Sequence, residues 1–178
     1  AQLGHSIESP VPSLFTFNIP NNPVTELMGV SADSALIKIQ GTKLKQTGPL
    51  LITHWGMSGP AVLKLSSWGA RVLNNMNYDF KINVNWNGTM SEQELRDLIA
   101  KDYNDIKRKK ISNVKLFALP SRLWLYLISK CEINPEMNWA DLRKEKLNKL
   151  INAICNDEYG VKGKTTFREE FVTCGGVS

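Results

Sequence analysis

Hydrophobic and polar residues alternate along several short stretches of this chain, which is the pattern of half-buried β-strands. Residues 78–86 show it most clearly, with an aromatic or aliphatic side chain at every second position. Weaker patterns predict strands over residues 14–17, 34–40 and 48–52, the last two as neighbours. Four prolines among the first thirty residues exclude a long helix there.

A helical period replaces this alternation in two parts of the chain. One helix is expected near residues 60–74, opened by Pro60 and capped by the side chain of Ser58. Three further helices are expected within residues 91–156. Their predicted starts are a capping box made by Ser91 and Glu94, then Pro120 with Ser121, and finally Asn138.

The order of these patterns predicts an α+β protein with two lobes. Residues 1–90 and 157–178 form a strand-rich lobe that includes the helix near 60–74, because strand patterns return after Gly160. Residues 91–156 form a helical lobe inserted into it. Neither end of the chain carries a capped element, so we expect the chain to be part of something larger.

Residues 50–71, written LLITHWGMSGPAVLKLSSWGAR, organise the strand-rich lobe as a strand, a tight loop and a helix. Such a junction can carry chemistry, because the helix N-terminus offers unpaired N–H donors to the loop. Ser58 resembles the nucleophile of a hydrolase, but Gly59 follows it directly and Pro60 stands where the second glycine of the elbow belongs. A serine hydrolase is therefore disfavoured.

Other motifs exclude further site types. Gly163, Lys164 and Thr165 match only the end of a phosphate-binding loop, since Glu158 stands at the position of its first glycine. No Gly-x-Gly-x-x-Gly occurs, so the sequence holds no dinucleotide fingerprint. The two histidines lack clustered ligand partners, which disfavours a metal site.

The composition, 42% hydrophobic and 22% charged residues, is that of an ordinary globular protein. No apolar run reaches the roughly 20 residues of a membrane span, so we expect no membrane partner and a cytoplasmic location. The three cysteines, Cys131, Cys155 and Cys174, are odd in number and far apart, which favours a reducing compartment over a disulfide framework.

The formal net charge of +5 is concentrated in the run from Lys107 to Lys110. This run is interpreted as the solvated end of a helix, where cations suit the helix dipole. A nucleic-acid partner is not expected, because the run lacks the interleaved aromatic residues of such surfaces.

Four segments resemble one protein family in their order and spacing: LFTFNI, GPLLITHWGMSGPAVLKLSSWGAR, LPSRLWLYL and GKTTFREEFVTCGGVS. The family is that of FAD-binding flavoproteins that includes aminoacetone oxidase and a bile-acid reductase, usually described as NAD(FAD)-utilising dehydrogenases. In it, a Rossmann-like FAD domain is interrupted by an insert, a partly open β-barrel with a helical subdomain. The resemblance implies that this chain is that insert, with the flanking FAD-binding domain of the same polypeptide as its partner.

The same resemblance implies a flavin-dependent redox reaction on a small organic substrate, with the insert roofing the cavity. FAD is expected in the full-length protein and not on this chain alone; a nicotinamide and oxygen are both candidate redox partners of the flavin. His54 is the implied catalytic residue, as a donor to a flavin or substrate oxygen. The implied cofactor-binding residues are Thr53, Gly56, Ser58, Gly59, Thr173, Gly175 and Gly176.

Two other interpretations stay open beside the substrate roof. The glycines of the loop can serve only to make a tight turn within the barrel. The chain can also be an independent binding module that uses the helical lobe and its basic run from Lys107 to Lys110.

Overall fold

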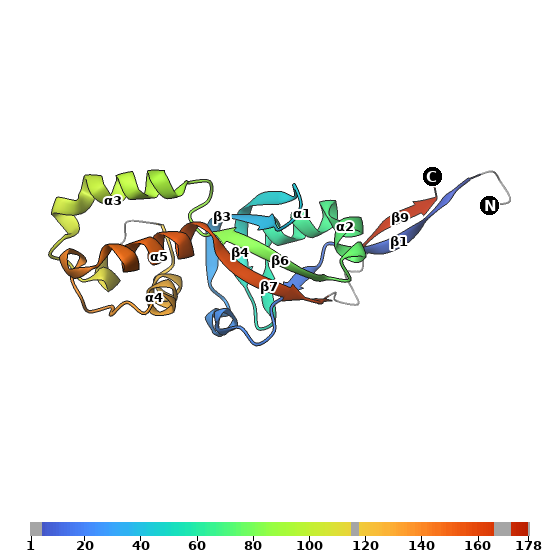
Figure 1. The fold of residues 1–178 in the computed structure, drawn as a ribbon. Helices are drawn as coiled ribbons and strands as arrows, with labels where there is room; N and C mark the ends of the chain where they lie inside the picture. Colours follow the sequence, from blue (N-terminus) through green and yellow to red (C-terminus); the bar gives the residue numbers. More distant parts are fainter. Residues whose placement is uncertain (1–4, 115–117, 166–171, 178) are drawn as a thin grey trace.

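The computed structural model describes residues 5–114, 118–165 and 172–177. Figure 1 shows three parts in a row: a two-stranded ribbon, a curled sheet, and a group of helices at the opposite end. The strands are β1 (Ile7–Ser13), β2 (Thr16–Asn18), β3 (Ser31–Ile39), β4 (Lys45–Ile52), β5 (Gly56–Ser58), β6 (Asp79–Asn85), β7 (Asp157–Lys162), β8 (Lys164–Thr165) and β9 (Val172–Val177). The helices are α1 (Pro60–Trp68), α2 (Ala70–Asn75), α3 (Glu92–Ile106), α4 (Ser121–Lys130) and α5 (Lys144–Cys155), with short 3-10 turns η1 (Pro23–Leu27), η2 (Ile111–Asn113) and η3 (Trp139–Asp141).

The larger sheet has the strand order β7-β6-β3-β4-β5-β2-β8, with antiparallel pairing between neighbours. Its two edge strands, β7 and β8, are separated in sequence by Gly163 alone. The Gly163 N–H donates to the carbonyl of Tyr78 at 2.8 Å, and its carbonyl accepts from Asn18 at 3.4 Å. The sheet therefore curls until its edges meet at one residue without pairing as strands, and the predicted partly open barrel is confirmed.

Apolar side chains from the strands and from one face of α1 fill the barrel. In β6 the alternation appears as predicted, with Phe80, Ile82 and Val84 buried. The buried Ser66 of α1 accepts a hydrogen bond from the Phe15 N–H at 3.0 Å and donates to the Leu63 carbonyl at 2.9 Å. Helix α1 thus packs on the barrel strands and also satisfies a buried backbone donor.

Three details of the helices differ from the predictions. Ser58 does not cap a helix, because it lies in β5 opposite Leu51, and Gly59 is the N-cap of α1 without a side-chain bond. The helix expected near residues 60–74 breaks at Gly69 into α1 and α2. The helix expected after Asn138 is only the 3-10 turn η3 at first, and α5 begins at Lys144.

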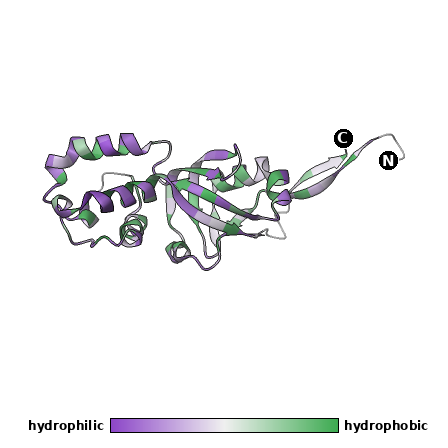
Figure 2. Ribbon diagram, viewed as in Figure 1, coloured by the Kyte–Doolittle hydropathy of each residue, from purple (hydrophilic) through white to green (hydrophobic). Residues whose placement is uncertain are grey.

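Helices α3, α4 and α5 form the helical lobe, the name used here for residues 91–156, between β6 and β7 (Figure 1). The predicted capping box is confirmed: Ser91 Oγ accepts from the Glu94 N–H at 3.3 Å, and Glu94 accepts from the Ser91 N–H at 2.7 Å. Hydrophilic residues dominate α3 in Figure 2, in contrast to the mixed colouring of the barrel strands. Within the described residues, no helix is both long and apolar enough to cross a membrane.

The ribbon pairs β1 with β9, two segments from opposite ends of the chain. Its register places Ile7 opposite Val177 and Ser13 opposite Val172. Figure 1 shows the ribbon projecting away from the barrel on the side opposite the helical lobe. The pairing was not predicted, because it joins the two ends of the chain and no local pattern records such a contact.

Candidate functional site

The segment with most of the predicted site residues forms a hairpin turn between β4 and β5. The Thr53 N–H donates to the Gly56 carbonyl at 2.8 Å, and the Gly56 N–H donates to the Thr53 carbonyl at 3.4 Å. His54 and Trp55 occupy the tip of this closed turn. The prediction that the loop leads directly into a helix is therefore wrong, because the short strand β5 lies between the turn and α1.

The tip presents two rings to solvent on a rigid support. The rings of His54 and Trp55 have centroids 5.7 Å apart and are tilted by 43°. Trp55 is 50% exposed, although its carbonyl is anchored by the Ile19 N–H at 2.7 Å. An exposed aromatic pair with a fixed backbone can stack on a planar ring, and the imidazole can donate a proton or a hydrogen bond beside it.

The two glycines of this segment are explained by packing within the barrel. A Cβ atom on Gly56 would lie 2.1 Å from the Phe17 carbonyl oxygen, and one on Gly59 would lie 2.9 Å from that of Pro49. The close backbone approach that these glycines allow is thus already taken by β2 and β4. Their contact with a cofactor stays a prediction, as it does for Ser58, and for Thr53, whose Oγ1 is buried without a hydrogen-bond partner among the described residues.

The other predicted site residues, Thr173, Gly175 and Gly176, lie in β9 of the ribbon. Thr173 pairs with Pro12 and Gly176 with Glu8, so these residues belong to a different sheet from the hairpin turn. A Cβ atom on Gly175 would lie 2.8 Å from the Ser9 carbonyl oxygen, whereas one on Gly176 would meet open space. The described structure therefore does not gather the predicted residues into one cradle, and they do not fit an FAD pyrophosphate by themselves.

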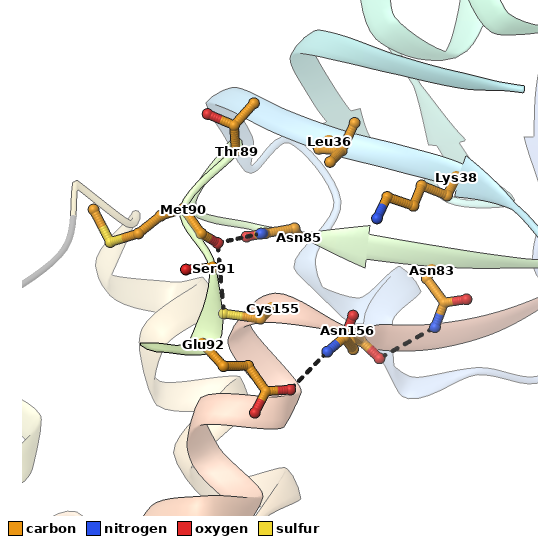
Figure 3. A pocket seen from close by; sticks show the side chains of 10 residues that line it. All are labelled: Leu36, Lys38, Asn83, Asn85, Thr89, Met90, Ser91, Glu92, Cys155 and Asn156. Atoms are coloured by element: carbon orange, nitrogen blue, oxygen red, sulfur yellow. Dashed lines mark hydrogen bonds between the residues drawn. The ribbon is translucent and has the colours of Figure 1, made fainter. Parts of the chain in front are cut away.

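A polar cavity of about 290 Å³ lies where the chain passes between barrel and helical lobe. Figure 3 shows side chains of β3 and β6 facing the start of α3 and the end of α5 across it. The cavity is lined by Leu36, Lys38, Asn83, Asn85, Thr89, Met90, Ser91, Glu92, Cys155 and Asn156. Sequence reasoning missed this site, and its one signal was the row of asparagines on the polar face of residues 78–86.

Hydrogen bonds across the cavity use most of its polar groups internally (Figure 3). Asn85 Nδ2 donates to the Met90 carbonyl at 2.7 Å, and Asn156 Nδ2 donates to Glu92 Oε1 at 2.8 Å. Burial, reinforced by Glu92, raises the pKa of the Cys155 thiol to about 11, so this cysteine is not a nucleophile near neutral pH. The hydrogen bonds across the cavity thus hold the two lobes together, and they leave no catalytic group evident among the lining residues.

A buried carboxylate lies on the other side of this junction. Asp157 is 2% exposed and accepts hydrogen bonds from the Trp86 indole at 3.0 Å, from the Tyr159 hydroxyl and from the Lys130 ammonium. Burial and the negative charge of Asp157 raise the pKa of Tyr159 well above its usual range. Because Lys130 ends α4 while Trp86 and Tyr159 belong to the barrel side, the carboxylate ties the two lobes together.

A known protein family has the same two parts, a barrel and a helical domain. The family described as HI0933-like protein barrel and H2TH domain matches residues 11–172, which spans both lobes. The chain belongs to this family. The resemblance to FAD-binding flavoproteins seen in the sequence is thereby confirmed, and so is the barrel with a helical subdomain.

Curated relatives of this HI0933-like chain have named activities. A ribosomal RNA dihydrouridine synthase of Haemophilus influenzae is 29% identical over 99% of the chain and 41% of its own length. The enzyme of the same name from Escherichia coli is 27% identical over 85% of the chain and 34% of its own length. A 3-dehydro-bile acid delta(4,6)-reductase of Clostridium scindens is 22% identical over 98% of the chain and 43% of its own length. The HI0933-like chain therefore spans about two fifths of these relatives or less.

Proposed function

We propose that this chain is the substrate-side domain of an FAD-dependent reductase that saturates a carbon–carbon double bond conjugated to a carbonyl group. One observation carries the proposal: the relatives' names describe the same type of chemistry on different substrates. Dihydrouridine is uridine with two added hydrogens, and a delta(4,6)-reductase acts on double bonds at positions 4 and 6. Flavins supply hydride for such reductions when bound.

The proposed contribution of this chain is to cover the substrate, while FAD is held by another part of the polypeptide. The internal packing of Gly56, Gly59 and Gly175 supports this division, because the close approach that these three glycines allow is already taken by neighbouring backbone. The exposed His54 and Trp55 are the groups we assign to the covered cavity. Trp55 would pack against the ring of substrate or cofactor, and His54 would donate a hydrogen bond to the substrate carbonyl oxygen.

The cofactor assignment is tested by titrating FAD into the purified 178-residue chain and into the longer polypeptide that contains it. We expect a stable flavin absorbance spectrum only for the longer protein. Stoichiometric, tight FAD binding by the chain alone would overturn the division of labour proposed above.

The role of His54 is tested in the longer protein with two acceptors, an RNA containing uridine and a steroid enone, with a nicotinamide as the candidate electron donor. His54→Ala is expected to slow flavin reoxidation by the accepted substrate by about 10²-fold or more, as for other lost proton donors. His5→Ala, at the other histidine, is the matched control. An unchanged rate for His54→Ala would assign His54 a structural role only.

A further inference from the structure

The excess of positive over negative charge in this protein lies mostly at one end of the molecule. The barrel and ribbon segments, residues 1–90 and 157–178, hold nine Lys and Arg and eight Asp and Glu. The helical lobe holds thirteen cations and nine carboxylates. Within the lobe, residues 107–110 and 136–144 alone contain six cations and two carboxylates, and the remainder of the lobe is balanced at seven each. We call residues 107–110 and 136–144 the basic tip.

The fold brings the two segments of the basic tip together. The Trp139 N–H donates to the Lys109 carbonyl at 3.1 Å, and the Ala140 N–H donates to the Lys107 carbonyl at 3.0 Å. A β-bridge between Lys110 and Asn138 continues this pairing. In Figure 1 the end of α3 and the start of α5 meet at the outer end of the helical lobe.

The expectation that the basic run simply ends a helix is therefore incomplete. Helix α3 ends at Ile106, and the run follows it as a segment whose backbone is fixed against the second segment. Arg143 lies three residues after Ala140, so their Cα atoms are at most about 11 Å apart. Lys144 begins α5 directly after it. All six cations are thus carried by one backbone pairing or by residues next to it in the chain.

Few of these cations are neutralised within the described residues. Lys110 forms an ion pair with Glu136 at 2.5 Å, and Lys107 donates to the Asn104 side chain at 3.0 Å. No ion pair is found for Arg108, Lys109, Arg143 or Lys144 among the parts of the chain that the structure describes. Four cationic side chains therefore have no ion-pair partner among the described residues and can contact a polyanion.

Few large apolar side chains are exposed at the basic tip. Trp139 is buried, as are Ile106 and Ile111 next to the tip, and Met137 and Leu142 are partly buried against the core. An amphipathic membrane anchor or a protein interface would expose apolar side chains at its centre. A mainly polar and positively charged surface with a fixed backbone instead matches a regular array of phosphates, which Lys and Arg bind without base contacts.

We propose that the basic tip binds the phosphate backbone of an RNA, so that the double bond reduced is in a base of an RNA chain. This inference rests on the proposed function and specifies its substrate class. The names of two relatives support it, because both act on ribosomal RNA. It replaces the expectation of no nucleic-acid partner. The missing aromatic residues matter less than assumed, since phosphate contacts position an RNA without stacking on its bases.

The test measures binding of a fluorescein-labelled RNA stem-loop to the 178-residue chain by fluorescence anisotropy between about 50 and 200 mM salt. The variant Arg108→Gln/Lys109→Gln removes two cations of the basic tip. The slope of log K against log salt is negative, and each lost phosphate contact makes it less steep by about 0.9. We therefore expect the slope to become less steep by about 1.8 for this variant.

The matched control is Lys43→Gln/Lys45→Gln, which removes the same charge from two exposed lysines of the barrel lobe. It should keep the slope of the unaltered chain, and both variants should keep its thermal midpoint. Equal losses in the two variants would overturn the proposal, as would competition by poly-glutamate as effective as that by unlabelled RNA. The assay needs no flavin, so failure of RNA binding with intact enone reduction would reject this inference alone.

Discussion

The barrel lobe and the helical lobe use their polar residues in opposite ways. In the barrel lobe, the strand-rich lobe of the sequence analysis, polar groups bond to one another or to the backbone. Ser66 accepts from the Phe15 N–H, and Asn83 and Asn85 of β6 donate to backbone carbonyls at the junction. In the helical lobe, the excess charge lies at the outer end and is largely unpaired within the described residues. The comparison shows that one lobe supplies a rigid frame and the other presents a surface.

The junction between the lobes combines both uses. The Asp157 carboxylate accepts hydrogen bonds from three donors, and one of these donors, Lys130, belongs to the helical lobe. One buried carboxylate thus contributes to the position of the surface relative to the frame. Substitutions in the frame, at the junction and in the helical lobe should therefore have effects of decreasing size.

The largest effect is expected for Gly56→Ala in the frame. The added Cβ atom would lie 2.1 Å from the Phe17 carbonyl oxygen, so β2 and β5 could not remain paired. We expect the free energy of unfolding to fall by about 4 kcal/mol or more, measured by denaturant titration. Gly160→Ala in β7 is the control, because its Cβ would meet nothing within 4 Å. Equal losses for the two variants would contradict the role assigned to Gly56.

The junction is tested by Asp157→Asn. Removing one partner of a buried ion pair costs about 3 to 5 kcal/mol, and the lower end applies here because Lys130 is 36% exposed and can regain water. We expect a loss of about 3 kcal/mol in the free energy of unfolding. A double-mutant cycle with Lys130→Met should show a coupling of about 1 kcal/mol or more. Additive losses would mean that the pair does not connect the lobes.

Within the helical lobe, Ser91→Ala should have a smaller effect. It removes the side-chain oxygen that accepts the Glu94 N–H, for an expected loss of about 1 kcal/mol. Hydrogen exchange in the first turn of α3 should rise in step with that loss. Ser129→Ala, at an exposed position of α4, should change stability by less than about 0.5 kcal/mol. A neutral Ser91→Ala would show that the cap is dispensable.

A pH-dependent effect, separate from the ranked substitutions, is expected from the ionisation of Tyr126 at the junction. Burial, with a contribution from Asp157, raises the pKa of Tyr126 from 10.0 to about 12. Between these two values the unfolded chain loses the phenolic proton and the folded chain keeps it, so the stability falls as the pH rises from 10 to about 12. Tyr126→Phe should flatten this part of the stability profile. An unchanged profile would place the alkaline sensitivity elsewhere, as at Tyr159.

Local patterns in the sequence predicted most of the fold. The alternation in residues 78–86 gave β6, and the Ser91–Glu94 box gave the start of α3, since both depend on near neighbours. β5 was missed because three residues containing a glycine carry no period. The pairing of β1 with β9 joins segments about 165 residues apart, which no local pattern records.

The sites were predicted less well, for a related reason. Asp157 looked like a polar residue between a helix and a strand, and its partners Trp86 and Lys130 lie 71 and 27 residues away. The basic run was visible, but its pairing with residues 137–140 was not. The role of His54 stays a prediction that rests on the family resemblance and on its glycine-containing loop, and those glycines are now explained by contacts with β2 and β4.

The pairing of β6 with β7 also has a consequence for how this family can diversify. Val84 lies opposite Asp157, and the Trp86 N–H donates to the Ile154 carbonyl at 2.8 Å, so the whole helical lobe occupies the position of a hairpin loop. A protein engineer could exchange that loop for a short turn, or graft it onto another hairpin, without altering the order of barrel strands. The exchange would have to include Asp157, whose carboxylate would otherwise stay buried without the lysine that neutralises it.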